Sequence, residues 1–178
     1  MIHGRTGSVT QVPVLTMPND DITHPIPDLT GYITEGQIVL DRELDQKGIY
    51  PPIAILPSLS RLMKDGVGKG FTREDHYDVS NQLFASYSKV QDARSLASVI
   101  GEDELSELDK QYLAFGDASS AGLSTRAWWQ PHHCGDAGLG WKLLTMLPRG
   151  ELDRVDAKTI EAHYVEGAWK ELFERKQS

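Results

Sequence analysis

The sequence contains little cysteine, no long apolar run and no excess of positive charge. Its 178 residues include one cysteine, Cys134, which excludes a disulfide framework and fits a reducing compartment. No stretch approaches the roughly 20 consecutive apolar residues that cross a bilayer, and the opening segment MIHGRTGSVT lacks the plan of a signal peptide. The 18 basic residues are outnumbered by 26 acidic ones, and the net charge of −8 argues against nucleic-acid binding, which needs a basic face. We therefore expect a protein that is soluble and cytosolic, or one that a partner tethers to another structure.

The rest of the composition is that of a folded protein with two different parts. Hydrophobic residues make up 39% and charged residues 25% of the chain, so a sizeable core can form. The length fits one ordinary domain or two small ones. Seven of the nine prolines lie at or before Pro57, whereas all four tryptophans lie at or after Trp128. We expect two units that meet near residues 61–72.

The first unit has the pattern of strands and loops. Alternation over residues 8–17 predicts a half-buried edge strand, and the Pro, Asp and Asn residues over 17–31 predict a long ordered loop. An apolar segment follows over 33–40, and the amphipathic DRELDQKG predicts a short helix that ends at Gly48. The apolar run Ile53–Leu56, bounded by prolines, predicts a buried strand.

The second unit has the pattern of helices. Thr72 and Asp75 are spaced as a capping box, and an apolar stripe at helical spacing follows them. Further helices are expected over about 104–115, near 141–147, and from an N-cap at Asp156. The apolar faces of these helices are expected to include Val79, Leu83, Tyr87, Val90, Leu105, Leu108, Tyr112, Phe115, Ile160, Tyr164 and Phe173.

Two segments resemble binding motifs but lack the required spacing. GVGKGFT at residues 66–72 has the glycines and lysine of a phosphate loop, but Met63 and Gly70 stand where the motif needs a glycine and a hydroxyl. We interpret it as a flexible hinge. The segment His132-His133-Cys134 offers metal ligands, but adjacent side chains diverge and no second Cys/His pair has a zinc-like spacing. We predict no metal site there.

Arg61 is the strongest candidate for a functional side chain. It follows a buried apolar run and the small hydroxyl residues Ser58 and Ser60, at the strand end where α/β sheets present ligand-binding groups. Without further context, a surface arginine at the start of a helix explains the same pattern.

Residues 7–66 resemble a known family. The phrases THPIPDLTGYITEGQI and KGIYPP…LPSLSRLMKDG are similar to the B subunit (beta chain) of A/V-type rotary ATP synthases and ATPases, and TREDH…VS.QL and LGWKLLTMLPRGELDRV extend the similarity. The resemblance implies an α/β fold followed by an all-α one. Residues 1–65 would be the C-terminal part of a RecA-like nucleotide-binding domain, and residues 66–178 a helical-bundle domain.

The resemblance also implies a site and partners. Arg61 falls on the arginine-finger position, from which it would reach in trans to ATP or ADP with Mg on the neighbouring catalytic A subunit. Ser58 and Ser60 would position the loop, and Tyr50 would pack at the nucleotide interface. The A subunits, in an alternating hetero-hexamer, and the central stalk would be the partners. The complex would meet the membrane only through its ion-translocating sector, at the cytoplasmic side.

The chain also departs from this family. The N-terminal barrel and the front of the nucleotide-binding domain of this family do not precede Met1. Because the sequence has no phosphate loop and no candidate general base paired to one, no catalysis is expected from the chain alone. Ala54 stands where the family usually has an acidic or amide residue. Residues 119–137 resemble nothing in the family, and restoring three single bases in an assumed coding sequence gives DAFISRAFNQGRGGNRTIVETLGLGWKLL, which does. We interpret this stretch as frame-shifted. A stand-alone interaction module and a non-functional product remain alternatives.

Overall fold

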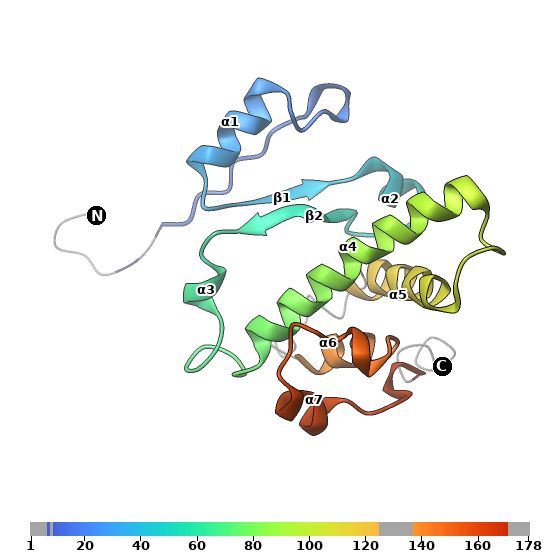
Figure 1. Ribbon diagram of the computed structural model, residues 1–178. Helices are drawn as coiled ribbons and strands as arrows, with labels where there is room; N and C mark the ends of the chain where they lie inside the picture. The colour runs from blue at the N-terminus through green and yellow to red at the C-terminus, as the bar shows by residue number, and fades with distance from the viewer. Residues whose placement is uncertain (1–6, 8, 125–136, 171–178) are drawn as a thin grey trace. The chain divides into compact units, whose positions relative to one another are not determined.

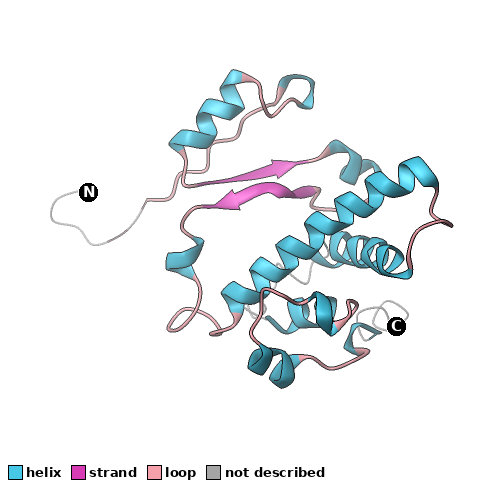
Figure 2. Cartoon of the chain, viewed as in Figure 1, coloured by secondary structure: helices cyan, strands magenta, loops and turns pink. Residues whose placement is uncertain are grey.

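The computed structural model describes residue 7 and residues 9–124 and 137–170. The chain divides into two compact units, Met1–Glu35 and Gly36–Ser178. Figure 1 shows the order of the elements, and Figure 2 shows helices in both units, with a single pair of strands among the described residues.

The described part of the first unit contains one α-helix, α1 (Pro25–Ile33), after the 3₁₀ turn Pro18–Asp20. Proline is tolerated in the first turn because the missing N–H has no helical partner there, and the Nδ1 atom of His24 accepts a hydrogen bond from the amide of Ile26 at 3.3 Å. The predicted loop over 17–31 is therefore wrong in its second half, where prolines begin a helix.

The predicted edge strand over residues 8–17 is also wrong. The described residues 9–17 have no regular secondary structure. Val12 and Val14 are 78% and 90% exposed, so this alternating pattern faces no sheet and no core among the described residues. Alternation is compatible with a strand, but a strand also needs a neighbour with which its backbone can pair.

The second unit begins with an antiparallel pair of strands, β1 (Gly36–Leu40) and β2 (Ile53–Ser60). The short helix α2 (Arg42–Gln46) connects them. The carboxylate of Asp41 caps α2 by accepting from the amide of Glu43 at 2.8 Å. The strand and helix predicted here are present, but β2 continues past the predicted end at Leu56 and is half-buried rather than buried.

Helices α3 (Met63–Gly66), α4 (His76–Ile100) and α5 (Glu107–Ser124) follow. The predicted capping box at Thr72 and Asp75 is wrong, because the hydroxyl of Thr72 accepts from the amide of Gly68 at 2.8 Å and α4 begins after Asp75. The helix predicted over 104–115 is present, but it begins and ends later.

Helices α6 (Ala137–Leu144) and α7 (Ala157–His163) complete the bundle, with the 3₁₀ turn η3 (Arg149–Glu151) between them and η4 (Ala168–Lys170) after α7. The helix predicted near 141–147 is present but is shifted toward the N-terminus. The predicted N-cap of α7 at Asp156 is confirmed. The helix ends before Tyr164, and Phe173 lies outside the described residues.

Apolar side chains of α4, α5, α6 and the following loop form one core. Helix α4 packs against both α5 and α6 (Figure 1). At the α4–α5 contact, a Cβ atom on Gly116 would lie 2.3 Å from the Cγ1 atom of Val90, so only glycine allows this approach. Among the described residues, no helix combines the length and apolar character needed to cross a bilayer. The core cluster consists of Val79, Val90, Ala93, Tyr112, Phe115, Ala118, Trp141, Leu143, Leu144, Leu147, Leu152 and Val155.

Candidate functional site

The predicted site residues lie along strand β2 and just outside it. Arg61 directly follows the strand and is exposed, while Ser58 and Ser60 are among the last residues of the strand. Tyr50 precedes the strand and is 79% exposed. The structure therefore brings Ser58, Ser60 and Arg61 together at one end of β2, and it places Tyr50 beyond the other end.

A large bulge interrupts β2 just before this end. Gln37 pairs with Leu59, and Val39 pairs with Ala54. Between these pairs β1 has only Ile38, whereas β2 has the four residues 55–58. Such bulges bend a strand and redirect the side chains that follow it. The bulge therefore decides the direction in which the chain reaches Arg61.

The side chain of Ser58 replaces part of the missing strand pairing. Its hydroxyl donates to the carbonyl of Ala54 at 2.6 Å and accepts from the amide of Val39 at 3.0 Å. The first bond closes the bulge on itself, and the second ties it to β1. The backbone carbonyl of Ala54 thus has a partner, although its side chain has no polar group.

Two residues of β1 contribute to this arrangement and were not predicted from the sequence. The Nε2 atom of Gln37 donates to the carbonyl of Pro57 at 2.8 Å. A Cβ atom on Gly36 would lie 2.8 Å from the carbonyl oxygen of Leu59, so β1 approaches β2 more closely than any side chain permits. A proline within a strand pattern is a sequence signal of a bulge, but it does not identify the residues that hold the bulge.

Arg61 is the charged residue at this strand end, and it is exposed. A guanidinium remains protonated at physiological pH and presents five N–H donors in a planar fork that matches carboxylate and phosphate oxygens. The neighbouring hydroxyl of Ser58 is occupied by backbone contacts. A guanidinium at this strand end has the chemistry to recognise an anion.

The glycine-rich segment 66–72 folds into turns rather than into a phosphate loop. Gly68 and Gly70 have φ of +100° and +95°, and the carbonyl of Gly68 accepts from the amide of Thr72 at 2.8 Å. The amide of Gly68, which a phosphate loop would present to a ligand, already donates to the Thr72 hydroxyl. The segment ends well before α4 begins at His76.

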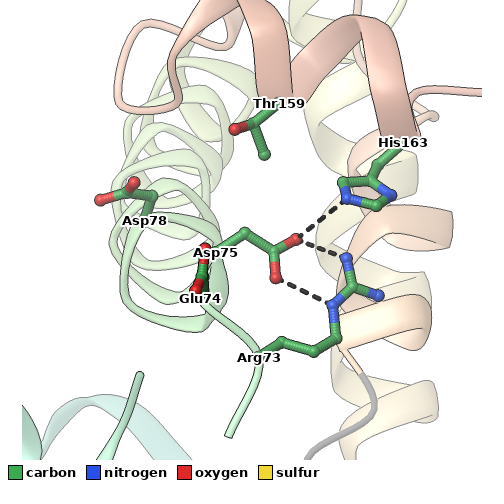
Figure 3. A pocket seen from close by; sticks show the side chains of 6 residues that line it. All are labelled: Arg73, Glu74, Asp75, Asp78, Thr159 and His163. Carbon is green, nitrogen blue, oxygen red and sulfur yellow. Dashed lines mark hydrogen bonds and ion pairs between the residues drawn. The ribbon is translucent and has the colours of Figure 1, made fainter. Parts of the chain in front are cut away.

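A shallow pocket of about 300 Å³ lies between the start of α4 and helix α7 (Figure 3). At its base, the carboxylate of Asp75 accepts from the Nε atom of Arg73 at 2.9 Å and from the indole N–H of Trp141 at 2.8 Å. The Nε2 atom of His163 lies 3.9 Å from the Oδ2 atom of Asp75. The remaining lining residues are Glu74, Asp78 and Thr159.

The hydrogen bonds in this pocket have a structural role, because they connect the start of α4 to α6. Burial raises the pKa of Asp75, but the hydrogen bonds from Arg73 and Trp141 together outweigh it and hold the pKa below its usual value. The carboxylate is therefore charged and engaged at neutral pH, so it offers no spare base for catalysis.

Two predictions concern residues that the structure does not describe. His132, His133 and Cys134 lie outside the described residues, and so do residues 125–136 of the stretch interpreted as frame-shifted. Within the described part of the chain, no group of three or more His, Cys, Asp or Glu side chains could hold a metal ion.

Comparison with known proteins connects this chain to ATP synthases. Residues 1–60 match the nucleotide-binding domain of the ATP synthase alpha/beta family, and residues 65–127 match the C-terminal domain of V and A type ATP synthase. These two matches confirm the predicted fold class, an α/β part followed by an all-α part.

The similarity to individual proteins covers most of this chain. It is 60% identical over 165 residues to the V-type ATP synthase beta chain 2 of Clostridium tetani, a match that covers 92% of this chain and 36% of that one. It is 56% identical over 164 residues to the B subunit of the A-type ATP synthase of Saccharolobus islandicus. This match covers 92% of this chain and 35% of that one. The chain spans about a third of the length of these curated relatives.

A solved structure is similar as well. It is that of the ATP synthase subunit NeqB from Nanoarcheaum equitans, with a TM-score of 0.54 and 52% sequence identity. The match covers 61% of this chain and 26% of the other.

Proposed function

We propose that this chain, which belongs to the ATP synthase alpha/beta family of the V and A type, acts as part of a non-catalytic B subunit and supplies Arg61 in trans to a catalytic A subunit. The observation that carries the proposal is the placement of Arg61. Arg61 is an exposed residue that directly follows β2, at a strand end shaped by a bulge with its own hydrogen bonds.

The proposed role of Arg61 is electrostatic. When ATP is made or hydrolysed, negative charge develops on the transferring phosphoryl group, and a guanidinium held beside it lowers the barrier. The A subunit would bind the nucleotide and its Mg. Ser58 would hold the bulge before Arg61, Ser60 would keep the strand end paired, and the exposed ring of Tyr50 would pack at the nucleotide interface.

The proposed assembly is an alternating hetero-hexamer of A and B subunits. Residues 1–65 would complete a nucleotide-binding domain, and residues 66–178 would contact neighbouring subunits and the central stalk. The complex would be peripheral, on the cytoplasmic side of a membrane, and would couple ATP synthesis or hydrolysis to ion transport through its membrane sector. The names of the similar proteins support membership in an ATP synthase complex.

The first test replaces Arg61 in a full-length B subunit that carries this sequence, assembled with A subunits. Arg61→Ala is expected to lower the turnover of ATP hydrolysis by a factor on the order of 10³, because only the transition state loses its stabilisation. Arg61→Lys keeps the charge but loses the fork, so it is expected to recover only part of the rate.

Lys64→Ala provides the matched control. Lys64 is exposed and lies three residues after Arg61. This variant therefore removes one nearby positive charge, and it is expected to keep normal turnover. Gel filtration establishes that each variant assembles. Undiminished turnover in an assembled Arg61→Ala complex would refute the proposed role.

The second test asks whether this chain itself binds the proposed partner. The purified chain is expected to show no ATP hydrolysis alone and to be retained on an immobilised A subunit. A stable monomer that the A subunit does not retain would contradict the assignment and favour a separate interaction module.

A further inference from the structure

We infer that Gln37 is a positioning residue for Arg61: through the bulge in β2, it fixes the point at which the chain leaves the sheet toward Arg61. The inference rests on the proposed function of Arg61. It is carried by a side-chain contact that links two residues twenty positions apart in the sequence, Gln37 and Pro57.

Gln37 holds β2 at two points. Its backbone pairs with Leu59, the first residue that resumes the ladder after the bulge. Its side-chain Nε2 atom donates to the carbonyl of Pro57 at 2.8 Å, within the bulge. Ser58 lies between these two points and makes its own bond to Val39. Gln37 thus spans the last part of the bulge and the first paired residue after it.

The bulge needs such a restraint because its length sets the register. One residue of β1 faces four residues of β2, so a bulge one residue shorter or longer would shift the register of every residue after it. Each such slip would turn the following side chains to the opposite face of the sheet. The bond from Gln37 to Pro57 favours the register in which Ser60 pairs with Gly36 and Arg61 follows.

The strand end transmits any shift directly to Arg61. At Gly36 the strands are so close that an added Cβ atom would lie 2.8 Å from the Leu59 carbonyl oxygen and 3.3 Å from the Cα atom of Ser60. Ser60 is the last residue of β2, and Arg61 is the next residue. A displacement of about 1 Å in a catalytic group can cost about 10²-fold in rate.

The test compares Gln37→Met with Gln37→Lys in the assembled complex with full-length B subunit. Met has a similar length but no donor, and its complex is expected to show kcat lower by a factor of about 10 to 100, with the KM for ATP unchanged. Lys has a donor at similar reach, so it is expected to restore most of the lost kcat. Gln46→Met, an exposed position on α2, is the control and is expected to behave as the unmodified complex.

A second measurement separates positioning from general stability. In an Arg61→Ala background, Gln37→Met is expected to lower kcat no further, because the effect passes through Arg61. An additional equal loss in that background would overturn the inference. If Gln37→Met does not assemble, Gln37→Glu takes its place, since a carboxylate of similar shape cannot donate to the Pro57 carbonyl.

The experiments distinguish a failure of this inference from a failure of the proposed function. Normal turnover in Arg61→Ala would overturn the function of Arg61 itself. A strong loss in Arg61→Ala with normal kcat in Gln37→Met would overturn only the positioning role of Gln37. A kcat loss in Gln37→Met that Gln37→Lys restores, and that disappears without Arg61, supports both.

Discussion

The carboxylate of Asp75 joins three helices at the base of the bundle. Asp75 is the N-cap residue of α4, it accepts the indole hydrogen of Trp141 on α6, and it lies 3.9 Å from His163 at the end of α7. Arg73 closes the group with two hydrogen bonds (Figure 3). Asp75 is 9% exposed, so these donors take the place of the water that the carboxylate loses on folding.

Replacing Trp141 with phenylalanine should show how much the buried indole bond contributes. Trp141→Phe keeps an aromatic ring in the core but removes the 2.8 Å bond to Asp75, and we expect a loss of about 1–3 kcal/mol in the free energy of unfolding. Urea unfolding at neutral pH, followed by circular dichroism, measures it.

The control for this prediction is a double-mutant cycle. The effect of Trp141→Phe should shrink in an Asp75→Asn background, because the charged acceptor is gone. The effect should also shrink in strong acid. Because the pKa of Asp75 is lower in the folded state, the charged carboxylate stabilises the fold at a pH above the usual Asp range. This stabilisation is lost as the pH falls through the folded-state pKa of Asp75. A loss that does not depend on Asp75 would indicate a cavity instead.

The sequence predicts where Arg61 and the neighbouring serines lie better than it predicts the residues that hold them. Arg61, Ser58 and Ser60 stand together after an apolar run, so their position at a strand end follows from the local pattern. Gln37 acts on Pro57, and a contact across a bulge depends on a register that local spacing does not specify. For the same reason, nothing near Asp75 in the sequence indicates Trp141.

At the scale of elements, the sequence predicts which helices form better than where they begin and end. The apolar spacing that predicts α4, α5 and α7 reflects the face that each helix buries. The ends depend on hydrogen bonds that several residues could make: Thr72 caps a turn at Gly68 instead of α4. Helix α1 escapes prediction because proline and aspartate favour turns and first helical turns alike.

The turn η3 is attached to the helices by one polar network. The carboxylate of Glu151 accepts from the Nζ atom of Lys89 on α4 at 2.7 Å and from the hydroxyl of Tyr112 on α5 at 2.6 Å. The buried amide of Gln82 adds bonds to the carbonyl of Glu151 and the amide of Arg154. The apolar loop after α6 can therefore close over the core while its backbone groups remain paired.

This network predicts a loss of stability in alkali. Burial, followed by the hydrogen bond to Glu151, raises the pKa of Tyr112 from 10.0 to about 12. The folded state therefore keeps a proton that the unfolded state releases, so the stabilisation is complete below pH 10 and is lost as the pH rises toward 12. Urea unfolding at pH 9 and pH 11.5 should show this fall.

Tyr112→Phe tests the assignment of the alkaline transition. The variant lacks the titrating hydroxyl, so its stability should be lower at pH 9 and should depend less on pH than that of the unmodified chain. Tyr32→Phe, at a ring that is 76% exposed in α1, should change neither value. An equally steep fall in Tyr112→Phe would assign the transition to other groups, such as Tyr164, whose pKa burial also raises.

At the scale of the whole molecule, the two units differ in how much they bury. No described residue of the unit Met1–Glu35 is buried, and Ile26, Leu29 and Ile33 of α1 are 55%, 61% and 82% exposed. The unit Gly36–Ser178 contains the whole described core. Because helices as short as α1, with 9 residues, are marginal in water without packing, the two units should open independently.

Hydrogen exchange measured by mass spectrometry should resolve this difference. Amides of α1 are expected to exchange at rates near those of an unstructured peptide, whereas amides of α4 around Val90 should exchange only when the bundle unfolds. Sub-denaturing urea provides the internal control, because it should accelerate exchange in α4 and leave α1 unchanged. Equal protection of both helices, with the same response to urea, would show one cooperative unit.

In the assembled complex, protection of α1 should rise, because its exposed apolar residues would be covered there.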